Sequence, residues 1–218
     1  MVDQALSDEQ RQLLAQLATT EHFTLQTARA STVAETNGRL SIFLGAVSSG
    51  VVALAFAGQV SKLGTAFFVF VFVLLPALFF LGIVTFARAV QSSVEDARYA
   101  HGLGRIHHLY VELAPALEPY FVLSTHDDLP DMIRRHGGTP GPWQLFLTTA
   151  GTVAAIDSII VGVLVGLACQ RAWQPNLVVA VVVGGLASTM SLVLHLLYEA
   201  RKWRQSEQAL RPVFPSKS

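Results

Sequence analysis

Residues 145–169 read LFLTTAGTVAAIDSIIVGVLVGLAC, an apolar run whose single charged side chain, Asp157, lies near its centre. Three further apolar runs occupy residues 40–57, 65–87 and 177–198. A helix of about 20 apolar residues, at a rise of about 1.5 Å per residue, matches the ~30 Å hydrocarbon core of a bilayer. The four runs therefore predict an all-α integral membrane protein, a four-helix bundle made of two helical hairpins with cytoplasmic helical extensions.

The composition and the distribution of charge support a membrane location. The 218 residues are 52% hydrophobic and 14% charged, whereas soluble domains have about 25% charged residues. Of the 15 Lys and Arg residues, only Lys62 and Arg171 lie in the short loops inside the two hairpins. By the positive-inside rule, both termini and the central loop are expected in the cytoplasm of a multi-pass cell-membrane protein, which we take to be of the bacterial inner membrane. The zero net charge predicts no nucleic-acid partner.

The chain divides by composition into five segments. They are a cytoplasmic N-terminal helix (1–39), a first transmembrane hairpin (40–87), a cytoplasmic helical loop (88–144), a second transmembrane hairpin (145–198) and a cytoplasmic tail (199–218).

Local signals predict where the helices begin and end. The sequence Ser-Asp-Glu-Gln at residues 7–10 is a capping box, so a helix should begin near residue 8. The pair Asn37-Gly38 is expected to end that helix before the first span. Residues 92–112 are expected to continue the second span as a helix, and Asp128 is expected to cap a short helix that ends at Gly137.

Small residues recur every four positions in the first, third and fourth runs, which favours close pairing of helices in lipid. The same stripes are compatible with a homo-oligomer or with a bundle closed within one chain. The second run instead contains seven phenylalanines and Pro76. We therefore expect spans one, three and four to pack centrally and span two to face lipid.

Asp157 is the residue that most needs a partner, since a carboxylate at the bilayer centre costs roughly 2.5–3.5 kcal/mol. One interpretation makes it an ion-path or proton-relay residue; the other makes it a structural hydrogen-bond partner of a neighbouring hydroxyl. Counting from the span midplanes places His195 on the order of 10 Å from Asp157 along the membrane normal, so no direct contact is expected. The candidates for the intramembrane polar path are Asp157, Ser48, Ser49, Ser188, Thr189 and His195.

Outside the spans, no pattern predicts catalysis, a cofactor or a metal. His108 and Glu112 share a helix face, but no second ligand pair has a diagnostic spacing. The hydroxyls of Ser48 and Ser49 are expected too far from His195 for a catalytic dyad. The single cysteine, Cys169, excludes an intramolecular disulfide. The residues expected to contact lipid head groups or a phosphate are Arg39, Arg134 and Arg135.

The stretch EHFTLQTARASTV at residues 21–33, with NGRLSIFLGAVSS at 37–49, resembles small uncharacterised bacterial four-span membrane proteins over about 30 residues, and the resemblance implies no activity. The layout, a cytoplasmic helix running into a tight two-span hairpin, is distantly similar to SLATT-type membrane effectors of bacterial defence systems. That similarity implies oligomerisation and membrane disruption on a nucleotide signal. The chain departs from the group in having four spans and no motif specific to it.

The sequence therefore predicts a non-enzymatic membrane protein: an oligomeric pore, a channel-like module or a membrane effector. The alternative is a membrane-anchored interaction, sensor or scaffold protein that uses the 88–144 loop and the termini. The expected partners are the lipid bilayer, further copies of the chain, and an anionic lipid or a cytoplasmic protein.

Overall fold

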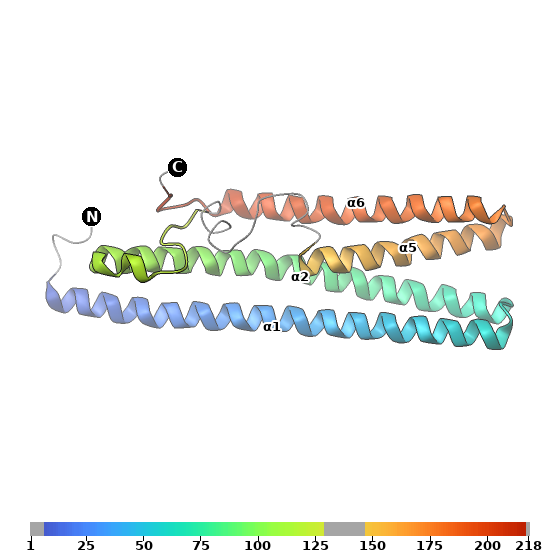
Figure 1. Cartoon of the computed structure of the whole chain (residues 1–218), viewed down its shortest axis with the longest axis horizontal. Coiled ribbons are helices and arrows are strands. Elements are labelled where there is room, and N and C mark those ends of the chain that lie inside the picture. Colours follow the sequence, from blue (N-terminus) through green and yellow to red (C-terminus); the bar gives the residue numbers. More distant parts are fainter. Residues whose placement is uncertain (1–6, 129–146, 217–218) are drawn as a thin grey trace. The chain divides into compact units, whose positions relative to one another are not determined.

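The computed structural model describes residues 7–128 and 147–216, which contain four long α-helices, one short 3-10 helix and no strand. The elements are α1 (Asp8–Ser61), α2 (Thr65–Leu113), η1 (Pro115–Tyr120), α5 (Thr149–Trp173) and α6 (Leu177–Ala209) (Figure 1). The four long helices are each long and apolar enough to cross a membrane. The prediction of an all-α protein with four apolar helices is confirmed. The short helix expected to end at Gly137 lies outside the described residues.

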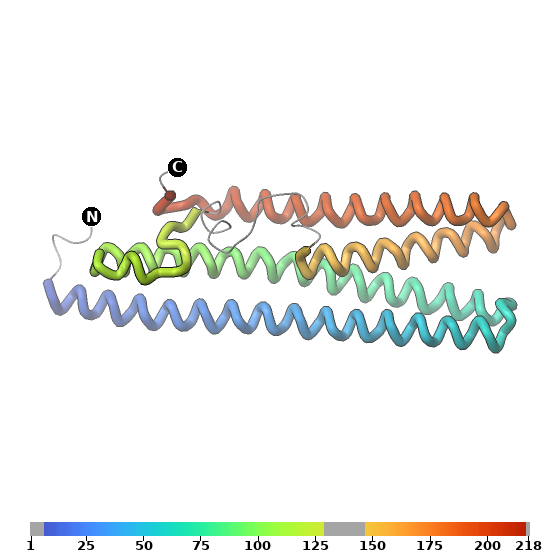
Figure 2. The backbone as a smooth tube through the Cα atoms, viewed as in Figure 1, coloured from blue at the N-terminus to red at the C-terminus, as the bar shows by residue number. Residues whose placement is uncertain are grey.

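The chain divides into two compact units. The extension unit consists of Met1–Glu35, Ser92–Gln144 and Lys202–Ser218, and the membrane unit consists of Thr36–Gln91 and Leu145–Arg201. Helices α1, α2 and α6 each contribute to both units without a break, as the tube in Figure 2 shows.

The start of α1 agrees with the capping-box prediction. Ser7 N donates to Gln10 Oε1 at 2.9 Å, and Gln10 N donates to Ser7 Oγ at 3.3 Å. The predicted break at Asn37-Gly38 is wrong, because α1 continues through both residues to Ser61. A glycine inside a helix costs only about 1 kcal/mol relative to alanine, which the helical segments on either side overcome.

The predicted extension of the second span is confirmed, since α2 runs from Thr65 through Pro76 to Leu113. The expectation that span two lies outside the centre, facing lipid, is wrong in part: Val73 and Phe80 are exposed on one face of α2, but another face is buried. Val71 and Leu75 of α2 are buried in one core cluster with Phe43 of α1 and Val153 of α5. The bulky side chains of α2 fill the space that the small residues of α5 leave open, so α2 and α5 form the centre of the membrane unit.

The small-residue stripes behave differently in different helices. A Cβ added at Gly184 of α6 would lie 2.6 Å from Gly162 O of α5, so the two backbones touch through glycine. The close pairing predicted for spans three and four is confirmed. In α1, by contrast, Gly45 and Ser49 are exposed on the surface of the membrane unit.

Both hairpins turn tightly. Lys62 and Leu63 adopt positive φ angles of 50° and 57° between α1 and α2. Gln174, with φ of 46°, ends α5, and α6 begins at Leu177. The ends of the helices at these turns are called the hairpin end of the membrane unit below.

In the extension unit, the first half of α1 packs on the second half of α2. The Arg29 guanidinium pairs with the Asp96 carboxylate through two hydrogen bonds of 2.6 and 3.2 Å. Tyr110 Oη donates to Thr19 Oγ1 at 3.3 Å. These contacts are long-range in sequence and fix the register of the two helices.

Candidate functional site

Asp157 of α5 and His195 of α6 form a buried pair inside the membrane unit. Asp157 is 0% exposed and His195 is 7% exposed. The distance from His195 Nε2 to Asp157 Oδ2 is 3.4 Å. The partner of the intramembrane acid is therefore His195.

The prediction that these two residues lie about 10 Å apart is wrong, and the turn between the helices gives the reason. Asp157 lies sixteen residues before Trp173, the last residue of α5, and His195 lies eighteen residues after Leu177, the first residue of α6. In an antiparallel hairpin this difference of two residues corresponds to about 3 Å along the helix axes. The register follows the three-residue turn rather than the centres of the apolar runs.

The hydrogen bonds of His195 fix which ring nitrogen carries a proton. His195 Nδ1 lies 2.8 Å from Ser191 O, and a carbonyl oxygen can only accept, so Nδ1 carries a hydrogen. The contact between Nε2 and the carboxyl group then needs one proton, either on the acid or on the ring. With one proton between the two groups, in either arrangement, the pair carries no net charge, which is the least costly state for a buried pair.

Helix α2 closes over the pair. An added Cβ at Gly82 would overlap Asp157 Oδ1, so only glycine allows this approach of α2 to the acid. The ring of Phe86 meets the ring of His195 edge-on, with centroids 4.6 Å apart. Within the part of the chain that the structure describes, the two carboxylate oxygens of Asp157 and His195 Nε2 make no hydrogen bond, so the two side chains face each other at ion-pair distance.

Further buried polar groups extend this pair along the interface of α5 and α6. Ser158 Oγ donates to Ser191 Oγ at 3.2 Å, and Ser191 Oγ lies 3.5 Å from His195 Nδ1. Towards the start of α5, Thr148 Oγ1 donates to Glu199 Oε1 at 3.4 Å, and Glu199 is 0% exposed. We call these six residues the polar column: Thr148, Asp157, Ser158, Ser191, His195 and Glu199.

The sequence analysis did not identify Ser158, Ser191 or Glu199 as site residues, although α6 carries a signal for them. Ser191, His195 and Glu199 are spaced four residues apart, so they lie on one face of α6. Beyond Ser158, towards the hairpin end, the contact between Gly162 and Gly184 replaces polar side chains. The polar column therefore occupies the half of the interface nearer the start of α5.

The hydroxyls expected to partner Asp157 do not do so. Ser48, Ser49 and Thr189 are exposed on the surface of the membrane unit, and Thr189 Oγ1 donates to Gly185 O at 2.9 Å in its own helix. Ser188 is half-buried, and its Cβ lies 2.8 Å from the position of a Cβ added at Gly162.

Of the three arginines expected to contact lipid head groups or a phosphate, Arg39 alone lies within the described residues. Arg39 is exposed on α1. Arg134 and Arg135 lie outside the described residues.

A groove of about 590 Å³ between α2 and α6 borders the polar column. Its walls include the aromatic rings of Phe79, Phe86 and Tyr198, and both His195 and Ser191 reach it. The column is thus covered by apolar side chains rather than by polar ones.

The structure does not assemble a metal site from its described residues. Across 7–128 and 147–216, no three His, Cys, Asp or Glu side chains are placed to hold an ion. His108 Nε2 lies 3.9 Å from Glu112 Oε1, as their spacing on one helix face predicts. No protein-family model, curated protein or solved structure matches this chain.

Proposed function

We propose that this protein is a proton-responsive, channel-like module of the cell membrane, assembled from several copies of the chain. The observation that carries the proposal is the buried Asp157–His195 pair, whose ionisable groups lie 3.4 Å apart in a chain with four membrane-length apolar helices. Ionisable groups inside a bilayer are expensive, and they are found where protons or ions move or are sensed.

A pair with one proton between its two groups can become charged in two ways. Loss of the proton would leave a net negative charge between α5 and α6, and gain of a second would leave a net positive charge. Either charge is costly in an apolar interior without water or a counter-charge. A change of protonation therefore favours a rearrangement of the hairpin that admits water to the polar column.

The column also suggests the direction of proton access. Serine, histidine and carboxyl side chains continue from Ser158 to Glu199, whereas Gly162 and Gly184 close the interface nearer the hairpin end. In the proposed orientation, with both termini in the cytoplasm, protons reach Asp157 from the cytoplasmic side. The smooth exposed surface at Gly45 and Ser49 of α1 suits a second copy of the chain.

Proton flux in liposomes tests this function. The purified protein would be reconstituted with a pH-sensitive dye in the lumen, a proton gradient and a potassium ionophore to compensate charge. We expect flux above that of protein-free liposomes, and we expect Asp157→Asn to reduce it to the protein-free level. Thr189→Ala, on an exposed face of the same hairpin, is the matched control and should keep the wild-type flux. Undiminished flux in a well-incorporated Asp157→Asn protein would overturn the proposal.

A second candidate function is membrane anchoring of an interaction or sensor protein. It is favoured by the extension unit, where the segment 211–216 is hydrogen-bonded to residues 105–128. Under this function, substitutions in the extension unit would abolish activity in cells, and Asp157→Asn would not.

A further inference from the structure

The loop of residues 124–128 forms a platform that packs closely on α2. A Cβ added at Gly104 would lie 2.5 Å from His126 O, so glycine permits the close approach of the loop. Ser124 Oγ accepts from His126 N at 3.0 Å and donates to His126 O at 2.9 Å. The loop is tied to α2 by His108, whose Nδ1 donates to Thr125 O at 3.2 Å.

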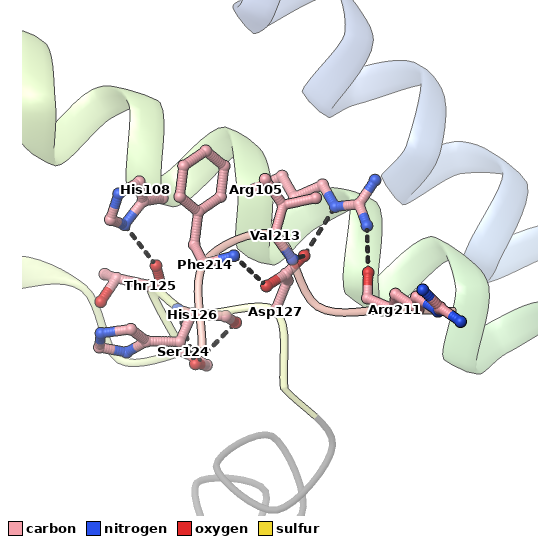
Figure 3. A network of polar contacts seen from close by, with 9 residues as sticks. All are labelled: Arg105, His108, Ser124, Thr125, His126, Asp127, Arg211, Val213 and Phe214. Atoms are coloured by element: carbon pink, nitrogen blue, oxygen red, sulfur yellow. Dashed lines mark hydrogen bonds and ion pairs between the residues drawn. The ribbon is translucent and has the colours of Figure 1, made fainter. Parts of the chain in front are cut away.

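Asp127 lies at the centre of this platform and is 0% exposed. Its carboxylate accepts three hydrogen bonds, from Val213 N at 2.8 Å, Phe214 N at 2.7 Å and Arg105 Nε at 2.7 Å (Figure 3). Burial alone would raise the pKa of Asp127, but the hydrogen bonds from Val213 N, Arg105 and Phe214 N hold that pKa below its ordinary value. A buried carboxylate of this kind needs its donors, since the loss of a hydrogen-bond partner leaves it desolvated and unpaired.

The segment 211–216 is recognised mainly through its backbone. Pro212 and Pro215 have no N–H, and the three N–H groups between Pro212 and Ser216 all donate to carboxylates: two to Asp127 and one, from Ser216 at 2.7 Å, to Asp128. Ser216 Oγ also donates to Asp128, at 2.8 Å. Such main-chain hydrogen bonds are how proteins bind extended peptides.

The remaining contacts orient the segment. Arg105 Nη2 donates to Arg211 O at 3.1 Å, and Asp127 N donates to Phe214 O at 3.3 Å. The Phe214 ring stacks on the His108 ring, with centroids 4.1 Å apart and planes at 22°. This stacking is the one side-chain contact that selects an aromatic residue.

The segment lies on the surface rather than within a core. Val213 is 57% exposed, and Pro212 and Pro215 are also exposed. Polar contacts to Asp127 and Asp128 hold it more than apolar burial does, so it can leave without disturbing a core. When the segment leaves, the Asp127 carboxylate loses the hydrogen bonds from Val213 N and Phe214 N. A peptide with the same backbone pattern would restore both hydrogen bonds.

We infer that Arg105, His108, Asp127 and Asp128 form a binding site for an extended peptide, which the chain's own segment 211–216 occupies reversibly. The inference concerns the extension unit and does not depend on proton flow through the membrane unit. A tethered segment has an effective concentration of the order of millimolar. An added peptide therefore competes only when the tether is cut or the tethered contacts are weakened.

Fluorescence anisotropy with a labelled peptide of residues 209–218 tests the site. The full-length protein would carry a protease site after Ala209, where α6 ends, and would be cut and freed of its released segment. We expect saturable binding to the cut protein. Asp127→Asn should weaken it about tenfold or more, because two donors then face a neutral amide. Glu118→Gln, at an exposed residue of η1, should leave it unchanged. A peptide that is N-methylated at the Phe214 amide lacks the N–H that donates to Asp127. It should bind the cut wild-type protein more weakly than the unmodified peptide does.

A second experiment, on the uncut chain, is used if the cut protein loses its helical structure. In the intact chain, Phe214→Ala combined with Ser216→Ala weakens the tethered segment and should raise the affinity for the added peptide above that of the intact wild-type protein. The inference is overturned if neither the cut protein nor the intact double variant binds the peptide. It is equally overturned if Asp127→Asn binds the peptide as well as the wild-type site. Both results would leave the liposome experiment on Asp157 unaffected.

Discussion

Replacing His195 by leucine should destabilise the membrane unit far more than replacing Asp157 by asparagine. His195 Nδ1–H is bound to Ser191 O, so the lone pair of Nε2 can accept from the side-chain amide of an asparagine at position 157. Asp157→Asn therefore costs at most about 1 kcal/mol, the net value of one hydrogen bond. His195→Leu leaves a fully buried carboxyl group without its partner, and breaking a buried pair in this way costs about 3–5 kcal/mol.

The assay is unfolding of the purified protein from mild detergent micelles by titration with sodium dodecyl sulfate, followed by circular dichroism. The account expects the free energy of unfolding of His195→Leu to lie about 2 kcal/mol or more below that of Asp157→Asn. Thr189→Ala serves as the control and should change it by less than about 0.5 kcal/mol. Equal losses in the two variants, or a stable His195→Leu protein, would refute the reasoning that the histidine holds the acid.

Three further predictions follow from other parts of the structure. Gly184→Val places a side chain against Gly162 O and should separate α5 from α6, which reduces the unfolding free energy in the same titration. Gly38→Ala meets open space and should raise helix stability by up to about 1 kcal/mol, measured as slower amide exchange around residue 38. Burial lowers the pKa of His107, against the opposing hydrogen bond to Ser124 O, so the folded extension unit favours the neutral ring. The stability that the neutral His107 ring contributes is complete above its unfolded pKa of about 6.5 and is lost as the pH falls below that value. Hydrogen exchange of the extension unit should show this loss of stability. The pH dependence should disappear in His107→Gln.

The sequence predicts the features that depend on local patterns. Four apolar runs predict four long helices, the Ser7 capping box predicts the start of α1, and the small residues at Gly162 and Gly184 predict a close pair of helices. Each of these depends on residues a few positions apart or on the length of one segment.

The errors concern how one helix lies against another. The separation of Asp157 and His195 depends on where the α5–α6 turn lies, and a midplane count misplaces it by several residues. The central position of α2 depends on Phe and Leu side chains fitting the small face of α5, which composition alone does not reveal. The hydrogen bonds of Asp127 to Val213 and Phe214 join residues more than 80 positions apart. No sequence pattern around Asp127 or around Val213 predicts this contact.

Solid-state NMR of the protein in lipid bilayers tests the central claim most directly, by measuring the dipolar coupling between ¹⁵N-labelled His195 Nε2 and ¹³C-labelled Asp157 Cγ. The account predicts a clear coupling, as expected for a ring nitrogen 3.4 Å from the carboxyl oxygen, together with a protonated Nδ1. The absence of that coupling in a correctly inserted protein would contradict the account.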